Sequence, residues 1–100
     1  MTNSARVSRV PDVLWTELEG QAVLLNIASS RYYQTNQLGR VIWESLETPR
    51  RVAEIVEQVV SRYRVEREQC RRDVLGFLAG LQAAGMIVLD GESEDSTVGT

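Results

Sequence analysis

The chain has 100 residues, of which 43% are hydrophobic and 25% are charged, and its formal net charge is −3. This length holds one small domain with a single core, and no apolar run approaches the roughly 20 residues that cross a bilayer. With no histidine and a single cysteine, Cys70, zinc clusters of the CxxC kind and an internal disulfide are excluded. We therefore expect a soluble, cytoplasmic protein that holds no metal and no cofactor.

The two ends differ from the middle in composition. Residues 1–11 are polar and end at Pro11, so we expect a flexible N-terminal arm. Four of the 14 acidic residues lie within residues 90–100, which are poor in bulky apolar side chains and are expected to be a disordered acidic tail. Without that tail, ten acidic residues face eleven arginines. The rest of the chain is therefore nearly neutral. It lacks the positive electrostatic field that non-specific nucleic-acid binding requires.

Three short strands are expected after the arm. Residues 13–18 and 21–27 have the two-residue side-chain period of strands, and Glu19-Gly20 is typical of the turn between them. After a turn at residues 28–30, the segment RYYQ at 31–34 is the third strand. Strands joined by such tight turns predict an antiparallel meander, with consecutive side chains on opposite faces.

Three helices are expected to cover the meander. The first covers residues 37–47 behind an N-cap at Asn36, because apolar residues recur there with helical spacing. Thr48-Pro49 resembles the cap and first position of a second helix, whose buried side ends at Tyr63. A third helix is expected from about residue 66 to residue 84, where Gly85 ends it. The order predicts one α+β domain over residues 12–89, in which residues 86–89 either add a brief strand or pack down.

Catalytic chemistry is absent from the pattern. No phosphate-binding glycine motif is present, and the carboxylate pairs lie on the polar faces of the expected helices. We therefore expect no catalytic residue and no enzyme activity, and look for a binding function.

Two features point to binding. The strand at residues 31–34 is a candidate sheet edge, whose free N–H and C=O groups can pair with an added strand; alternatively, Tyr32 and Tyr33 only brace the sheet. In the third helix, Gly76 and Gly80 each cost on the order of 1 kcal/mol relative to alanine. On a helical wheel Asp73, Gly76 and Gly80 lie along one flank of the buried stripe. The two glycines either leave a shallow channel there for another backbone or permit close packing within the chain.

The chain resembles the PqqD-like family, the peptide-recognition elements of pathways that modify ribosomally made peptides. The resemblance rests on VLLN…RYY…N..G..IW..L within residues 23–46, on VAEIVEQVVSRY and on DVLGFLAGLQAAGMI, and it covers roughly residues 13–88. Among subfamilies the chain is most similar to the free-standing leader-binding proteins of lasso-peptide biosynthesis. It departs from the family at Ser30, where glycine is common, and at Thr35, where leucine is common.

The resemblance implies a winged-helix-like fold with a three-stranded antiparallel sheet followed by three helices, and a non-catalytic function. The leader of a precursor peptide would add as a strand beside the third strand, in a groove walled by the third helix, and would be presented to a leader peptidase of the cysteine-protease class and then to a cyclase. Carried over residue by residue, the peptide-binding positions are Arg31, Tyr32, Tyr33, Gln34, Arg72, Asp73, Gly76, Phe77 and Gly80, with Arg71 and Leu75 as alternates.

Two other functions stay open. A winged-helix DNA-binding protein would use the arginines at 62, 64, 67, 71 and 72, although Glu66, Glu68 and Asp73 interrupt that patch. A PqqD-type chaperone for quinone-cofactor biosynthesis would present its peptide to a radical enzyme instead of a protease.

Overall fold

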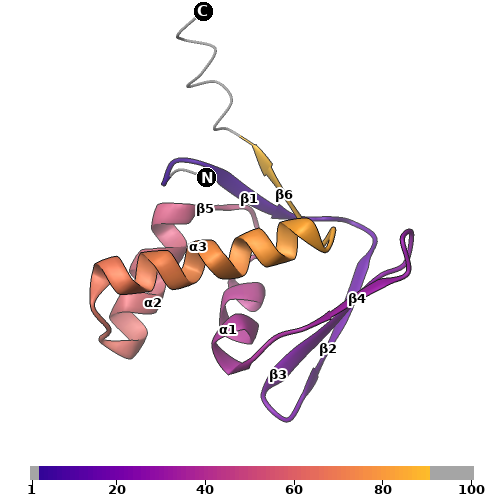
Figure 1. Ribbon diagram of the computed structural model, residues 1–100, viewed down its shortest axis with the longest axis horizontal. Helices are drawn as coiled ribbons and strands as arrows, with labels where there is room; N and C mark the ends of the chain where they lie inside the picture. The colour runs from indigo at the N-terminus through magenta and orange to yellow at the C-terminus, as the bar shows by residue number, and fades with distance from the viewer. Residues whose placement is uncertain (1–2, 91–100) are drawn as a thin grey trace, which may run out of the picture.

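The structure is a computed structural model that describes residues 3–90. Figure 1 shows its strands and helices. In chain order they are β1 (Arg6–Arg9), β2 (Val13–Leu18), β3 (Gln21–Asn26), β4 (Arg31–Gln34), α1 (Gln37–Ser45), β5 (Arg50–Arg51), α2 (Val52–Tyr63), α3 (Arg67–Ala83) and β6 (Ile87–Asp90). The predicted α+β order of a three-stranded meander followed by three helices is confirmed.

The meander is an antiparallel sheet with the strand order β2-β3-β4. Leu24 at the centre of β3 is opposite Trp15 on β2 and Tyr33 on β4. The inner face of β3 is formed by Ala22, Leu24 and Asn26, which are buried, whereas Leu25 on the other face is 43% exposed. Hydrophobic periodicity alone placed these side chains on opposite faces, and burial shows which face packs on the core.

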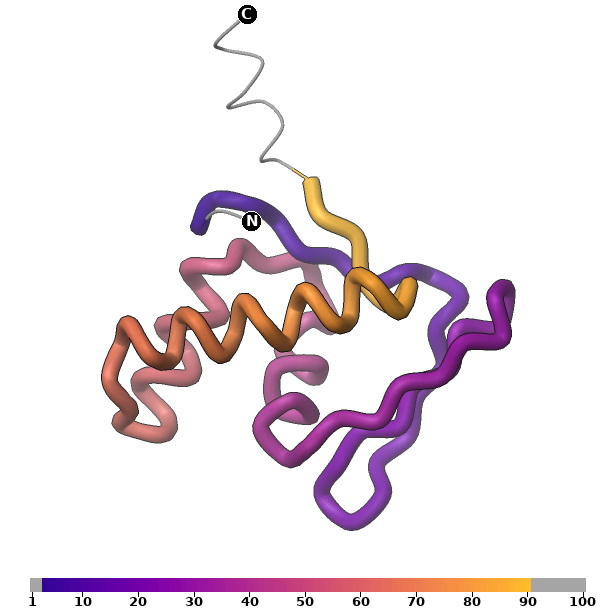
Figure 2. Tube along the Cα trace, in the orientation of Figure 1, coloured from indigo at the N-terminus to yellow at the C-terminus, as the bar shows by residue number. Residues whose placement is uncertain are grey.

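A second sheet joins the two ends of the described chain, with the strand order β5-β1-β6. The sequence predicts a flexible arm over residues 1–11, but Arg6–Arg9 form β1, which pairs with β6 along its whole length. Ala5, just before β1, and Val7 within it are fully buried. The arm prediction is wrong for this segment because its partner lies about eighty residues away in the sequence, beyond the reach of local patterns. In Figure 2 the traces of β1 and β6 lie side by side.

The predicted helix ends are confirmed at the start of α1 and at the end of α3. The Asn36 side chain accepts a hydrogen bond from the Gly39 N–H at 2.8 Å, so the predicted N-cap of α1 is confirmed. Gly85 follows α3 with φ of +80°, a conformation that favours glycine. The predicted start of α2 at Thr48-Pro49 is wrong. Arg50–Arg51 instead pair with β1, and α2 begins at Val52 with the Arg51 N–H donating to Glu54 at 2.8 Å.

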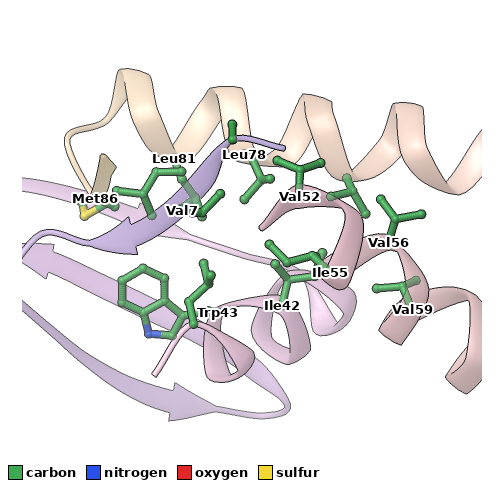
Figure 3. Close-up of a cluster of buried hydrophobic side chains, with 14 of the residues drawn as sticks. Val7, Ile42, Trp43, Val52, Ile55, Val56, Val59, Leu78, Leu81 and Met86 are labelled. Atoms are coloured by element: carbon green, nitrogen blue, oxygen red, sulfur yellow. The ribbon is translucent and has the colours of Figure 1, made fainter. Parts of the chain in front are cut away.

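The core lies between the three helices and the inner faces of the two sheets (Figure 3). Trp43 on α1 is fully buried, and α2 and α3 contribute Ile55, Leu78 and Leu81. The tail predicted over residues 90–100 is wrong at its first residue, because Asp90 ends β6 and is opposite Arg6 of β1. The rest of that tail, residues 91–100, lies outside the described residues. Across residues 3–90, no helix has both the length and the apolar character needed to span a bilayer.

Candidate functional site

The outer edge of β4 is unpaired within residues 3–90, because β4 has β3 as its only strand neighbour there. The Thr35 N–H, which follows β4, donates to the Ala22 carbonyl on β3 at 2.8 Å. Backbone groups of an antiparallel strand alternate in direction, so Tyr33 and Arg31 also face β3. The N–H and C=O groups of Tyr32 and Gln34 therefore point away from the sheet and are available to an added strand.

The two tyrosines of β4 point to opposite faces, as predicted. Tyr32 is 63% exposed on the outer face of the meander. Tyr33 packs against the core cluster and meets Phe77 of α3 edge-on, with 6.4 Å between ring centroids. The Tyr33 ring thus closes the inner side of the space between β4 and α3 and leaves the edge of β4 open.

The two glycines of α3 have different surroundings. A Cβ atom added at Gly76 would have no heavy atom within 4 Å, apart from the helix's own backbone and the neighbouring residues. A Cβ atom added at Gly80 would lie 2.8 Å from the Tyr33 hydroxyl. Both explanations offered by the sequence therefore apply, one to each residue. Gly80 permits close packing within the chain, and Gly76 leaves open space on the α3 surface.

A cavity of about 390 Å³, here called the groove cavity, lies between the start of α1 and α3. It is lined by Asn36, Leu38, Gly39, Ile42, Arg72, Asp73, Gly76 and Phe77. Four of these residues on α3 were predicted as peptide-binding positions. The other four, three on α1 and its N-cap Asn36, were missed, although Asn36 and Gly39 belong to the pattern that carried the family resemblance. In the sequence, Asn36 was explained as an N-cap and the apolar residues by helical spacing. Their position opposite α3 depends on the tertiary fold.

The opposite end of the same flank is shallower. A hollow there is lined by Arg31, Tyr32, Gly80, Ala83 and Ala84. The Arg31 guanidinium donates to the Ala83 carbonyl at 2.6 Å and connects the start of β4 to the end of α3. Gln34 lines neither cavity, and its amide donates to the Gln21 side chain at 2.6 Å. The nine predicted residues thus lie on β4 and on one flank of α3, with the groove cavity at one end and this hollow at the other.

The alternates have other surroundings. Leu75 packs against the core cluster. Arg71 pairs with Glu68 at 3.4 Å and lines a separate pocket with residues of α2. Neither lines the groove cavity.

Beside the groove cavity lies a smaller and more apolar one of about 210 Å³, here called the side pocket. Its lining is Leu38, Val59, Tyr63, Val65, Gln69, Cys70, Asp73 and Val74. Leu38 and Asp73 line both cavities, so the two cavities are adjacent. Tyr63, predicted to be on the buried side of α2, is 41% exposed at this pocket. Burial raises the pKa of the Cys70 thiol, which is free and mostly uncharged at neutral pH.

The two charged residues that line the groove cavity share one neutral partner, Gln69. The Asp73 carboxylate accepts from Gln69 at 3.0 Å, and Arg72 donates to the same glutamine side chain at 3.0 Å. Outside the groove, Arg67 pairs with Glu57. Of the arginines considered for DNA contact, Arg67 and Arg71 are thus compensated by neighbouring acids, which weakens the patch for phosphate binding.

The arrangement suits the binding of an extended chain. Within the described part of the chain, no three side chains of His, Cys, Asp or Glu gather where they could hold a metal ion. What the site offers is an open strand edge, a parallel groove and two cavities, which together match an extended polypeptide.

Comparison with known proteins is consistent with this geometry. The family described as coenzyme PQQ synthesis protein D (PqqD) matches residues 21–87. A solved structure of TbiB1 in complex with the TbiA(beta) leader peptide is 28% identical, with a TM-score of 0.74 over 84% of this chain and 95% of that chain. A lasso peptide synthetase B1 complexed with the leader peptide is 25% identical, with a TM-score of 0.68 over 82% and 96% of the two chains. A search among curated proteins gave no significant match.

Proposed function

Because this chain belongs to the PqqD family, we propose that it binds the leader segment of a ribosomally made precursor peptide as an added strand on β4. The observation that carries the proposal is the free edge of β4 beside the groove cavity. Strand addition supplies main-chain hydrogen bonds that tolerate many sequences, and pockets for alternate side chains supply selectivity. Both solved relatives are complexes with leader peptides, which supports the same function here.

We propose that the added strand runs antiparallel to β4, as do the paired strands of the fold, and that the outward groups of β4 set its register. An antiparallel strand would bond to the outward N–H and C=O groups of Tyr32 and Gln34. Its residue opposite Tyr33 would point inward, toward Phe77 and Gly76, because opposite residues of a sheet share a face. Its neighbours on either side would point outward, next to the exposed ring of Tyr32. Alternate residues of the leader would therefore determine selectivity.

The more specific part of the proposal is the biosynthetic pathway to which the precursor peptide belongs. The likeness to lasso peptide proteins supports a lasso-peptide leader, presented to a leader peptidase of the cysteine-protease class and then to a cyclase. The chain itself would be non-catalytic and would act in the cytoplasm, where precursor peptides are made.

A second candidate within the family is a chaperone for quinone-cofactor biosynthesis, which the description of the matching family favours. Its bound peptide would be a precursor handed to a radical enzyme. The two candidates share the strand-addition site and differ in the peptide. Titration with one lasso leader and one quinone-cofactor precursor distinguishes them by affinity.

Isothermal titration with the leader of the precursor encoded beside this gene tests binding itself. Amide hydrogen exchange then tests the mode: the N–H groups of Tyr32 and Gln34 should exchange fast in the free protein and slowly in the complex. The N–H of Tyr33, which faces β3, serves as the internal control and should change little. Absence of binding at high micromolar leader would count against the function. Binding without protection of Tyr32 and Gln34 would count against strand addition alone.

A further inference from the structure

The C-terminal end of α3 is held by a side chain of the meander. Helix α3 has no basic residue in its last turn, where the helix dipole favours a positive charge. The Arg31 guanidinium of β4 supplies that charge and donates to the Ala83 carbonyl at 2.6 Å. The N–H groups of residues 84–86 bond to other carbonyls of the helix, those of Gly80, Leu81 and Gln82. The strand that would accept the leader therefore completes the capping of the helix that walls the groove.

A second bond of the same kind comes from Asn26, the residue opposite Arg31 on β3. The Asn26 amide donates to the Gly85 carbonyl at 2.7 Å, and its side-chain oxygen accepts from the Ser29 N–H at 3.1 Å. Asn26 is only 6% exposed, so a buried amide is satisfied at both of its ends. The turn after α3 is thus fixed to the β3–β4 hairpin at two adjacent points.

These contacts set the distance between β4 and α3. Arg31 and Tyr33 are two residues apart on β4, so their side chains share the inner face, and they meet α3 at Ala83 and Gly80. The strand and the helix therefore run in opposite directions and touch at this end. At Gly76, one turn nearer the start of α3, the space between them is open and continues into the groove cavity. The groove thus narrows toward the end that Arg31 holds.

We infer that Arg31 is a positioning residue of the leader groove: supported by Asn26, it holds the end of α3 at the distance from β4 that an added strand requires. This rests on the proposed function. The family resemblance placed Arg31 among the peptide-binding positions, but its backbone groups face β3 and its guanidinium is bonded to α3. Arg31 therefore acts on the leader through the helix. Without it, the end of α3 moves more freely, and the leader binds only the fraction of molecules whose groove has the right width.

Arg31→Ala tests the inference, and Arg40→Ala is the matched control. Arg40 on α1 donates to the Gly20 carbonyl at 2.7 Å, which is also a bond between two elements, and it lines neither the groove cavity nor the side pocket. We expect the leader affinity of Arg31→Ala to fall about fivefold or more and that of Arg40→Ala to stay within about twofold of the native protein. Thermal melts show that both variants are folded at the temperature of the titration.

The kinetics of binding distinguish positioning from direct contact. A smaller binding-competent fraction slows association and leaves dissociation nearly unchanged, because the bound complex keeps all of its contacts. Loss of a direct contact would instead speed dissociation. We therefore expect the loss in Arg31→Ala to lie mainly in the association rate constant, measured by biolayer interferometry on an immobilised leader.

Amide hydrogen exchange reports the movement of α3 itself. The N–H groups of residues 84–86 close the end of the helix. They should exchange faster in free Arg31→Ala than in the native protein or in Arg40→Ala, because local opening at this end becomes easier. Saturation with the leader should remove most of that difference, since the complex forms with α3 in its native position.

The outcomes separate the inference from the function on which it rests. If Arg31→Ala binds the leader with native affinity, the groove does not depend on Arg31 and the inference is wrong, while strand addition on β4 stands. A loss that lies in the dissociation rate would make Arg31 a direct contact and would also overturn the inference. Equal losses in Arg31→Ala and Arg40→Ala would reflect a general loss of stability, with the same consequence. Failure of the native protein to bind any leader would remove the proposed function and the inference with it.

Discussion

The hydroxyl group of Tyr33 lies directly over Gly80. A Cβ atom at residue 80 would be 2.8 Å from that oxygen, whereas the nearest ring carbon, Cζ, would be 3.6 Å away, an ordinary contact distance. The hydroxyl alone thus accounts for the steric conflict. This contact joins the strand that would accept the leader to the helix that walls the groove.

The effect of Gly80→Ala on stability should therefore depend on the Tyr33 hydroxyl. In a helix interior, replacing glycine by alanine normally stabilises by about 1 kcal/mol. In the Tyr33→Phe background we expect that gain, and in the native background we expect it to be cancelled by the clash, which gives a coupling free energy of about 1 kcal/mol. Urea unfolding of the four proteins measures it. Additive effects of the two substitutions would show that the tyrosine moves aside freely.

Gly76 should behave in the opposite way. Because no neighbouring atom obstructs a Cβ atom there, Gly76→Ala should raise the free energy of unfolding by about 1 kcal/mol through helix propensity. Gly76→Trp should fold equally well but fill the groove cavity, and its leader affinity should fall by about a hundredfold or more. Calorimetric titration and thermal melts measure the two properties separately. Unchanged leader affinity in Gly76→Trp would mean that Gly76 has no part in binding.

The contrast between these glycines shows how far sequence reasoning extends. Helical spacing correctly placed Gly76, Gly80 and Asp73 on one flank of α3, since this follows from local geometry. It gave no means of telling which glycine faces open space, because that depends on where Tyr33 of another element lies. The strand β1 was missed for the same reason: its partner β6 is remote in sequence.

The sequence predicted one side of the groove cavity and missed the other. The α3 side was predicted from the family resemblance. The helix-propensity cost of Gly76 and Gly80 also pointed to this side. The α1 side, with Leu38 and Ile42, was read only as a buried stripe, which is how most such residues are used. Similarly, Tyr63 fits the apolar spacing of α2 and was predicted to be buried. Because α2 ends at Tyr63, its side chain stays partly exposed to solvent.

Asp73 should contribute to leader binding more than its exposure suggests. It borders the groove cavity and the side pocket, whereas Glu57 pairs with Arg67 outside both. We expect Asp73→Ala to weaken leader binding by about tenfold, the effect of losing one charge-assisted hydrogen bond. Glu57→Ala is the control and should leave the affinity unchanged, since exposed ion pairs contribute little. Titration of both variants with the same leader is the measurement, and equal affinities would contradict the assignment.

Arg9 should matter for stability and not for binding. Its guanidinium lies 4.3 Å from the centroid of the Trp43 ring and 5.7 Å from that of Trp15, and it donates to the Trp43 carbonyl at 2.5 Å. It thereby connects β1 to the meander and to α1. Burial lowers the pKa of Arg9, against the opposing effects of Glu47 and Glu44, yet an arginine stays charged across the physiological range.

We therefore expect Arg9→Ala to lower the free energy of unfolding by about 2–3 kcal/mol, from the lost hydrogen bond, ring contacts and stem packing. The loss should be the same at pH 6 and pH 8, because no proton is bound or released in that range. Arg9→Lys should recover only part of it, since lysine keeps the charge without the planar fork. Denaturant unfolding at the two pH values measures this, and leader titration of the folded variant should give the native affinity, because Arg9 lines neither the groove cavity nor the side pocket. A complete rescue by lysine would show that charge alone, and not stacking between the two indole rings, stabilises this junction.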